Sequence, residues 1–212
     1  MVGQGLLRQC LLEPDVQCVT TVGRIATGMQ HPKLREVVHK DLSNYSPIET
    51  ELSGFDGCFF CLGVSSAGMA EADYERITYG ITMAAAETLS RLNSQMTFIY
   101  VSGAGTDSSE WGRVMWARVK GRTENSLLRL PFKAAYMFRP GVIQPLYGAT
   151  SKTAWTRLFY SLSKPLLPVL RRIFPDYILT TEQIGQAMLA VIRQGAPKRV
   201  LESKDIRAIL ES

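Results

Sequence analysis

One stretch of the sequence, from Met96 to Lys120, constrains the fold more than any other. It opens with an apolar run, Met96–Val101, whose short length and β-branched residues are typical of a strand buried on both faces. The small residues Ser102-Gly103-Ala104-Gly105 follow and place a hydroxyl at the carboxyl end of this strand. A helix comes next, with Trp116 and Lys120 four residues apart on one face. Because ligands bind at the carboxyl ends of strands in open parallel sheets, this stretch predicts a binding site.

The composition indicates one ordered globular domain. A chain of 212 residues suits a single α/β domain spanning 1–212, and its 46% hydrophobic and 20% charged residues exclude a mainly disordered protein. The net charge of +5 and the pI near 9.1 raise the question of a polyanionic partner. The basic residues are spread along the chain, with the densest patch from Lys152 to Arg172. So modest an excess of positive charge suits an anionic cofactor as well as a nucleic acid, and we expect a cofactor and no nucleic acid.

Apolar segments with strand and helix character alternate along the chain, without the tight-turn sequences that mark hairpins. The alternation predicts a parallel sheet with right-handed crossovers, which is an α/β fold. The predicted strands are Val16–Val22, Arg35–His39, Gly57–Gly63, Met96–Val101, Ala134–Arg139 and Arg199–Leu201. The predicted helices are Leu6–Leu11, Pro47–Ser53, Ala70–Leu92, Trp111–Leu130, Thr181–Arg193 (capped by Thr180 or Thr181) and Lys204–Leu210.

Residues 144–180 differ in composition from the rest of the chain. They contain many aromatic and basic side chains and four of the ten prolines. We interpret them as a substrate-side insertion or lid. An alternative is a membrane-surface segment at 155–174, where aromatic residues and leucines alternate with basic side chains. Pro165 and Pro168 would interrupt a long amphipathic helix there, which favours the lid.

The four cysteines, Cys10, Cys18, Cys58 and Cys61, do not form a disulfide framework. Cys58-x-x-Cys61 has the spacing of a redox or metal motif, but residues three apart in a strand point to opposite faces. We therefore favour buried strand thiols in a reducing cytosol and expect no metal. The first residues do not have the pattern of a signal peptide, and no apolar run is long enough to span a bilayer. On these grounds we expect a cytoplasmic location.

Four short motifs occur in order along the chain: Cys61-Leu62-Gly63, Val101-Ser102-Gly103, Val119-Lys120-Gly121 and Phe138-Arg139-Pro140-Gly141. Together they resemble an atypical short-chain dehydrogenase/reductase, and most closely the small NAD(P)H-binding, epimerase-like proteins related to the HIV Tat-interacting oxidoreductase. The resemblance covers nearly the whole chain. It implies a Rossmann-like doubly wound parallel sheet, a nicotinamide dinucleotide cofactor and a small carbonyl or sugar-like substrate.

The chain departs from this family at its start. The family begins with a strand and a G-x-x-G-x-x-G turn, of which Met1-Val2-Gly3 matches only the end, with Gly3 as the last glycine. The missing strand lies in the middle of the family's sheet, so two edges would stay unpaired, at about 1–3 kcal/mol for each lost backbone hydrogen bond. We therefore expect the natural protein to extend upstream of Met1.

By the same resemblance, the cofactor contacts fall on Gly3, Arg24, Asp41, Leu42, Leu62, Gly63, Lys120, Pro140 and Gly141. Arg24 follows the second family strand, where an acidic residue favours NAD and an arginine favours the 2′-phosphate of NADP. The resemblance therefore implies NADP (NADPH) rather than NAD. A solvated loop arginine at Arg24 and a plain loop aspartate at Asp41 are the alternatives.

The catalytic group implied by the resemblance is Ser102, Trp116 and Lys120. The family's reductases use a tyrosine as general acid four residues before the lysine, and here Trp116 stands in that place. An indole N–H does not titrate, and neither Tyr100 nor Tyr136 is four residues from Lys120. Two functions stay open. One is an oxidoreductase or epimerase of unusual mechanism, and the other is an NADPH-binding sensor or protein-interaction module on the same fold.

Overall fold

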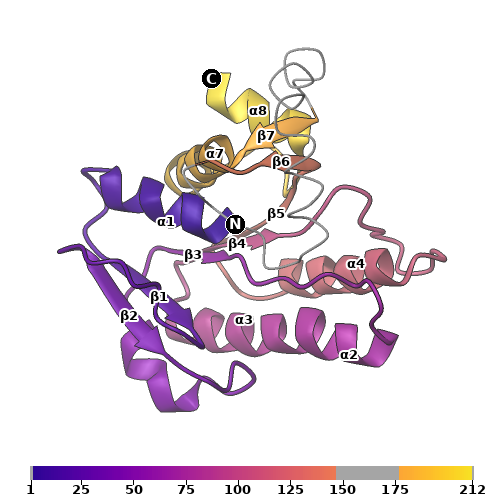
Figure 1. Cartoon of the computed structure of the whole chain (residues 1–212), viewed down its shortest axis with the longest axis horizontal. Helices are drawn as coiled ribbons and strands as arrows, with labels where there is room; N and C mark the ends of the chain where they lie inside the picture. The colour runs from indigo at the N-terminus through magenta and orange to yellow at the C-terminus, as the bar shows by residue number, and fades with distance from the viewer. Residues whose placement is uncertain (1, 147–176, 212) are drawn as a thin grey trace.

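The structure of the protein is a computed structural model that describes residues 2–146 and 177–211 (Figure 1). Its helices are α1 (Val2–Leu12), a 3₁₀ helix (Ser46–Leu52), α2 (Glu71–Glu75), a π-helix (Arg76–Gly80), α3 (Ile81–Leu92), α4 (Met115–Leu128), α7 (Thr181–Gln194) and α8 (Ser203–Glu211). Its strands are β1 (Val19–Gly23), β2 (Leu34–Val38), β3 (Gly57–Phe60), β4 (Thr97–Val101), β5 (Ala134–Arg139), β6 (Val142–Gln144), β7 (Ile178–Thr180) and β8 (Val200–Glu202).

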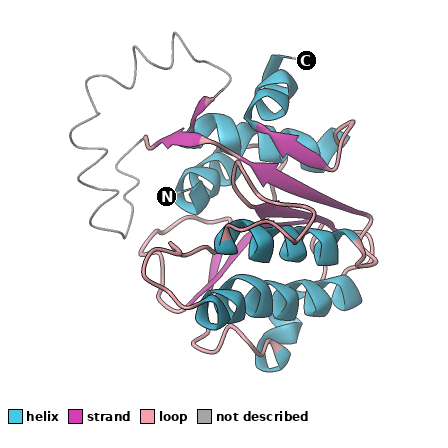
Figure 2. Cartoon of the chain, turned by 90° about the vertical axis from the view of Figure 1, so that its right-hand side faces the viewer, coloured by secondary structure: helices cyan, strands magenta, loops and turns pink. Residues whose placement is uncertain are grey.

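All of these strands pair in parallel, in three sheets ordered β1-β2, β3-β4-β5-β8 and β6-β7. In the largest sheet Gly57 lies opposite Thr97, and Thr97 lies opposite Ala134. Figure 2 shows helices on both faces of this sheet. The predicted α/β fold with a Rossmann-like parallel sheet is confirmed.

The centre of the core is formed by β4 and β5. Phe98, Ile99, Tyr100 and Phe138 are each at most 1% exposed. Successive strand residues point to opposite faces, so Phe98 and Tyr100 join the hydrophobic cluster that includes α3, while Ile99 joins the one that includes α1 and α7. Because both faces of β4 are covered, the segment Met96–Val101 is an apolar run rather than apolar only at alternate positions.

Helix α1 packs closely on α7, and glycine allows the approach. A Cβ added at Gly5 would lie 2.8 Å from Thr181 Cβ, and one added at Gly185 would lie 3.3 Å from Leu6 Cα. Helix α7 starts with a capping box, in which the Thr180 hydroxyl accepts from the Gln183 backbone N–H at 3.1 Å. Of the two predicted caps, Thr180 is therefore the one that forms.

Two predicted helices need correction. The single helix predicted for 70–92 is interrupted by the π-helix Arg76–Gly80. The helix predicted to begin at Trp111 begins at Met115, because the Asp107 carboxylate binds the Gly112 N–H at 2.7 Å and holds the preceding residues in a loop. Asp107 lies five residues before Gly112, outside the predicted helix, so the spacing of apolar residues within that helix did not indicate this contact.

The region after β5 contains two strands that the sequence did not predict, β6 and β7, each only three residues long. They pair with each other, so the two ends of the predicted insertion at 144–180 lie side by side. Most of that insertion, including the alternative membrane-surface segment at 155–174, lies outside the described residues.

The four-stranded sheet and the β1-β2 sheet are not joined by strand pairing within the described residues. Within the described ranges β1 is hydrogen-bonded only to β2, and β3 is bonded only to β4. Each of these two strands therefore has one edge whose backbone groups have no strand partner in the described part of the chain. All five residues of β1 are only half-buried.

Candidate functional site

The loops that follow β4 and β5 meet at the carboxyl end of the four-stranded sheet. The Ser102 N–H donates to the Phe138 carbonyl oxygen at 2.7 Å, and the Ala104 N–H donates to the Pro140 carbonyl oxygen at 3.1 Å. Gly141 donates its N–H to Ser203 Oγ at 2.8 Å. These bonds bring three predicted site residues, Ser102, Pro140 and Gly141, to one end of the sheet.

There is open space at this end. A Cβ added at Gly63, after β3, or at Gly103, after β4, would meet no atom within 4 Å. Leu62 is half-buried and Gly63 is exposed. The surroundings of both strand ends therefore leave room for a ligand to approach the backbone.

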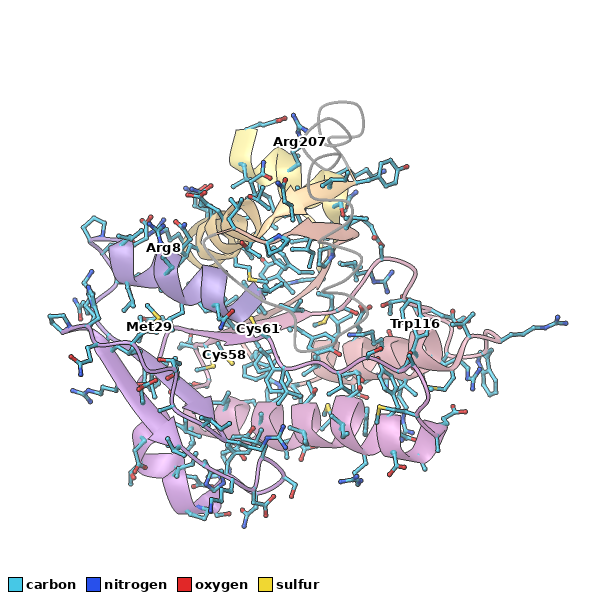
Figure 3. The ribbon with its side chains drawn as sticks, viewed as in Figure 1. Arg8, Met29, Cys58, Cys61, Trp116 and Arg207 are labelled. Atoms are coloured by element: carbon cyan, nitrogen blue, oxygen red, sulfur yellow. The ribbon has the colours of Figure 1, made fainter. Side chains whose placement is uncertain are left out.

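The start of α1 borders the same region. A Cβ added at Gly3 would lie 3.3 Å from Cys61 Cβ, so the first turn of α1 packs tightly on the segment after β3. Figure 3 shows Cys61 close to the first turn of α1. The last glycine of a dinucleotide-binding turn permits this kind of close packing between helix and strand.

The Ser102 hydroxyl is held by a neighbour. Its Oγ lies 3.0 Å from Thr106 Oγ1, and Thr106 Oγ1 donates to the Gly103 carbonyl oxygen at 2.8 Å. Because the Thr106 proton is used in that second bond, Ser102 is the donor in the first. A substrate carbonyl at Ser102 would compete with Thr106 for this proton.

Trp116 lies in the first turn of α4 (Figure 3) and comes near the loop after β4. A Cβ added at Gly105 would lie 3.5 Å from the Cη2 atom of its ring. The indole is half-buried. It provides a flat apolar wall for the site, and it contributes no group that can donate and recover a proton at ordinary pH.

Lys120, one turn further along α4, reaches back to β4. Its Nζ donates to Tyr100 Oη at 3.4 Å and lies 5.2 Å from the centre of the Tyr100 ring. Burial lowers the pKa of Lys120 to about 8, although the charge of Glu124 acts in the opposite direction. Burial also raises the pKa of Tyr100, so the phenol stays neutral. Tyr100 therefore contacts Lys120 across the fold, a contact that spacing along the sequence did not reveal.

A buried ion pair supports the same helix. Arg139 Nε donates to Glu124 Oε1 at 3.0 Å, while Arg139 Nη1 contacts Glu202 and Nη2 donates to Ser108 Oγ at 2.6 Å. Glu124 is 1% exposed and Arg139 is 8% exposed. Arg139 was not among the predicted site residues, yet an arginine within an apolar strand needs a buried carboxylate partner, which is a signal that the sequence contains.

Gly121 allows the loop after β4 to lie on α4. A Cβ at this position would come within 1.8 Å of the Asp107 carbonyl oxygen. The Asp107 N–H donates to the Ala117 carbonyl oxygen at 3.1 Å, and Asn125 Nδ2 donates to the Ser108 carbonyl oxygen at 3.0 Å. The loop that begins at Ser102 is thus fixed to the helix that carries Lys120.

The residues predicted for the adenine side lie after β1 and β2. Arg24 is exposed and forms no ion pair within residues 2–146 and 177–211. Asp41 is exposed and accepts from the Ser43 hydroxyl and backbone N–H, bonds that lower the pKa of its carboxyl group. Leu42 is buried in the core beside Tyr45, so only Asp41 of this pair presents its side chain to solvent.

The four cysteines are free thiols. Burial raises the pKa of Cys58 and raises that of Cys61 to about 12, so neither is a thiolate near neutral pH. Across the described part of the chain, no group of three or more His, Cys, Asp or Glu side chains lies close enough together to hold a metal ion.

No protein-family model matches the sequence. Protein FMP52-2, mitochondrial, of Scheffersomyces stipitis is 31% identical over 128 residues, which cover 59% of this chain and 54% of that protein. Protein FMP52, mitochondrial, of Candida albicans is 23% identical over 147 residues, covering 68% of this chain and 63% of that protein. The chain thus spans less than two thirds of the length of these relatives.

Solved structures resemble the whole chain. The Bordetella bronchiseptica enzyme WbmF in complex with NAD+ superposes with a TM-score of 0.67 at 14% identity, covering 99% of this chain and 74% of that one. The ADP-L-glycero-D-manno-heptose-6-epimerase of Helicobacter pylori gives a TM-score of 0.66 at 15% identity, covering 100% of this chain and 77% of that one. The chain has the Rossmann-like fold of these proteins.

The expected cytoplasmic location is wrong by these comparisons, because the curated relatives are named as mitochondrial proteins. Buried thiols require only a reducing compartment, and the cytosol is not the only one. Among the helices of the described residues, none has both the length and the apolar character to span a bilayer.

Proposed function

We propose that this protein binds a nicotinamide dinucleotide and acts as an oxidoreductase or epimerase-like enzyme on a small carbonyl or sugar-like substrate. The observation that carries the proposal is the convergence of Ser102, Gly103, Pro140 and Gly141 at the carboxyl end of the sheet, with Lys120 on the adjoining helix. The WbmF enzyme, which shares the fold, is in complex with NAD+.

The residues around this sheet end suit a dinucleotide. The first turn of α1 offers backbone N–H groups without helical partners, and Gly3 lets that turn approach β3 closely. The space beside Gly63 and Gly103 suits a ribose or a nicotinamide ring, and Lys120 adds positive charge. When bound, the nicotinamide supplies or accepts a hydride. In this proposal the Ser102 hydroxyl orients a substrate carbonyl, and Trp116 shields the site from water.

Residues 144–180 would then serve as the substrate-side lid of a single domain. The strand pair β6-β7 supports this role, because β6 begins directly after Gly141 at the site end of β5. Substrate-covering segments commonly occupy this position relative to a rigid sheet.

NADP is the proposed form of the cofactor, and Arg24 is the residue that supports it. It is exposed after β1, where a guanidinium can bind a 2′-phosphate. A charge-assisted contact of this kind contributes about 1.5–3 kcal/mol, or roughly tenfold or more in affinity.

Titration of the protein with NADPH and with NADH, followed by tryptophan fluorescence, tests this preference. We expect tighter binding of NADPH and loss of most of the preference in Arg24→Ala. Arg129→Ala, at the exposed end of α4, is the matched control and should leave the preference unchanged. Equal dissociation constants in the unmutated protein would contradict the assignment to NADP.

The alternative function, an NADPH-binding sensor or interaction module, is favoured by Trp116, which cannot act as a general acid. The substitution Trp116→Tyr separates the two functions, because it places a phenol one turn from Lys120. If the native protein only binds, the variant should gain NADPH turnover with a panel of carbonyl compounds by about 10²–10⁴, the usual contribution of general acid catalysis. Lys120→Met in that background should remove the gain. Brisk turnover by the native protein, abolished in Trp116→Tyr, would exclude the sensor.

A mitochondrial location is proposed from the names of the FMP52 relatives. Fractionation of cells that express the natural gene from its own start tests this location. Recovery of the protein in the cytosol alone would contradict it.

A further inference from the structure

Lys120 is an amine with an unusual set of neighbours. Within residues 2–146 and 177–211, its Nζ has one hydrogen-bond partner, the neutral Tyr100 hydroxyl at 3.4 Å. No carboxylate of that part of the chain lies within ion-pair distance of it. Glu124, one turn away, is instead bound by Arg139.

The groups packed around Lys120 do little to hold a proton on it. Tyr100 faces it from β4, and the pKa of Tyr100 is raised by burial and, in smaller part, by Tyr74 of α2. On its own helix the charge of Glu124 favours the ammonium, but Arg139 from β5 neutralises that carboxylate. Burial is the larger effect and brings the pKa of Lys120 to about 8. Near pH 7.5 it holds on the order of 10² times more free amine than an ordinary lysine.

The amine also lies on the side of the sheet where a carbonyl would bind. Tyr100 and Ser102 are two residues apart along an extended segment, so their side chains point to the same face. Lys120 approaches that face from α4 and is itself only half-buried. The open space beside Gly103 adjoins Ser102.

From this geometry we propose that Lys120 is a reactive amine that condenses with small aldehydes bound beside Ser102, with Tyr100 as its positioning residue. This inference rests on the proposed function only in placing a carbonyl substrate at the same strand end. The lone pair of Nζ attacks the carbonyl carbon, and the proton lost by nitrogen passes to the carbonyl oxygen, which gives a carbinolamine. Loss of water then gives the imine, with no oxidant or reductant.

The test uses propanal as the probe and sodium cyanoborohydride to trap the imine as a stable secondary amine. The protein is incubated without cofactor across pH 6–10, and the modified lysines are identified by peptide mass spectrometry. We expect Lys120 to be modified at least tenfold faster at pH 7.5 than the exposed Lys133, with a half-maximal rate near pH 8. Modification at that peptide should be absent in Lys120→Arg, which keeps the charge.

Tyr100→Phe tests the positioning role and keeps the ring while it removes the hydroxyl. Modification of Lys120 should slow several-fold at saturating pH, whereas Lys133 should be unaffected. Equal rates at Lys120 and Lys133 with the same pH profile would overturn the proposal. A separate titration with NADPH distinguishes this failure from failure of the proposed function. Tight NADPH binding without selective modification would leave Lys120 as a cofactor ligand only, and selective modification without NADPH binding would uphold the amine and refute the cofactor.

Discussion

The four-stranded sheet and the two-stranded sheet of this protein bury their strands to very different degrees. In β4 four of the five residues are buried, and in β5 five of six. In β1 all five residues are half-buried, and in β2 three of five are exposed. Both sheets have regular parallel pairing, so the hydrogen-bond ladder does not distinguish them, and we expect their stabilities to differ through packing. The region packed on both faces should be the more stable one, because apolar burial is the larger contribution.

The difference matters for the site. Ser102 and Lys120 are held by the well-packed region, whereas Arg24 and Asp41 follow strands with few buried neighbours. Regions with few buried apolar contacts open locally at low free energy. We therefore expect the end of the proposed site at Arg24 and Asp41 to be the more mobile part, and the end at Ser102 and Lys120 to be the rigid part.

Phe98→Ala should have the largest effect on stability. Phe98 is 0% exposed and stacks on Phe132 at 5.0 Å between ring centroids, so its removal leaves a cavity. We expect a loss of about 3–5 kcal/mol in the free energy of unfolding. Val22→Ala in β1, measured alongside by urea denaturation, should cost less than about 1.5 kcal/mol. Equal losses of unfolding free energy in Phe98→Ala and Val22→Ala would contradict the distinction between the two sheets.

Gly121→Ala should have the next largest effect. The added methyl group would meet the Asp107 carbonyl oxygen at 1.8 Å, which forces the loop away from α4. We expect a loss of about 2–4 kcal/mol. Gly23→Ala, at the end of β1, is the matched change, because its nearest neighbour would be the Ile25 carbonyl oxygen at 3.4 Å. Circular dichroism melts should show little change in Gly23→Ala, and a comparable loss in both would contradict this comparison.

Lys120→Met should raise the free energy of unfolding rather than lower it, by a smaller amount that depends on pH. The pKa of Lys120 is about 8 in the folded protein and ordinarily about 10.4 in an unfolded chain. Below pH 8 the folded state carries the full cost of keeping Lys120 charged in its partly desolvated position, and that cost disappears as the pH rises to about 10.5. The variant should therefore be more stable by roughly 1–3 kcal/mol at pH 7, and the gain should vanish near pH 10.5.

The quantity to measure is the difference in unfolding free energy between Lys120→Met and the parent protein at each pH. The absolute stability also changes with pH through Cys10 and Cys61, which act in the opposite direction. Burial raises the pKa of both thiols, so the unfolded chain loses their protons first and stability falls above about pH 8.5. Lys40→Met, after β2, is the control for a lysine in the exposed region. A gain in Lys120→Met that does not depend on pH would indicate a packing effect instead.

The sequence predicted those parts of the fold that depend on neighbouring residues. The strand at Ala134–Arg139 has its predicted bounds because its apolar run is bordered by a lysine and a proline, and Thr180 caps α7 through a residue three positions away. The buried contacts of the site were not predictable in this way. Tyr100 and Lys120 are 20 positions apart, and Glu124 and Arg139 are 15 apart. Such pairs are set by the approach of α4 to the sheet, which no local pattern encodes.

The free edge of β1 has a consequence for how the chain behaves in a crowded solution. Its sequence, Val19-Thr20-Thr21-Val22-Gly23, is uncharged and rich in β-branched residues, and its backbone groups on one side have no strand partner within the described residues. Such edges are templates for pairing between molecules, which natural sheets usually prevent with charges, proline or a covering segment. Concentrated or partly heated samples should therefore aggregate through this strand first, and a lysine at Thr20 or Thr21 is the substitution that would suppress it.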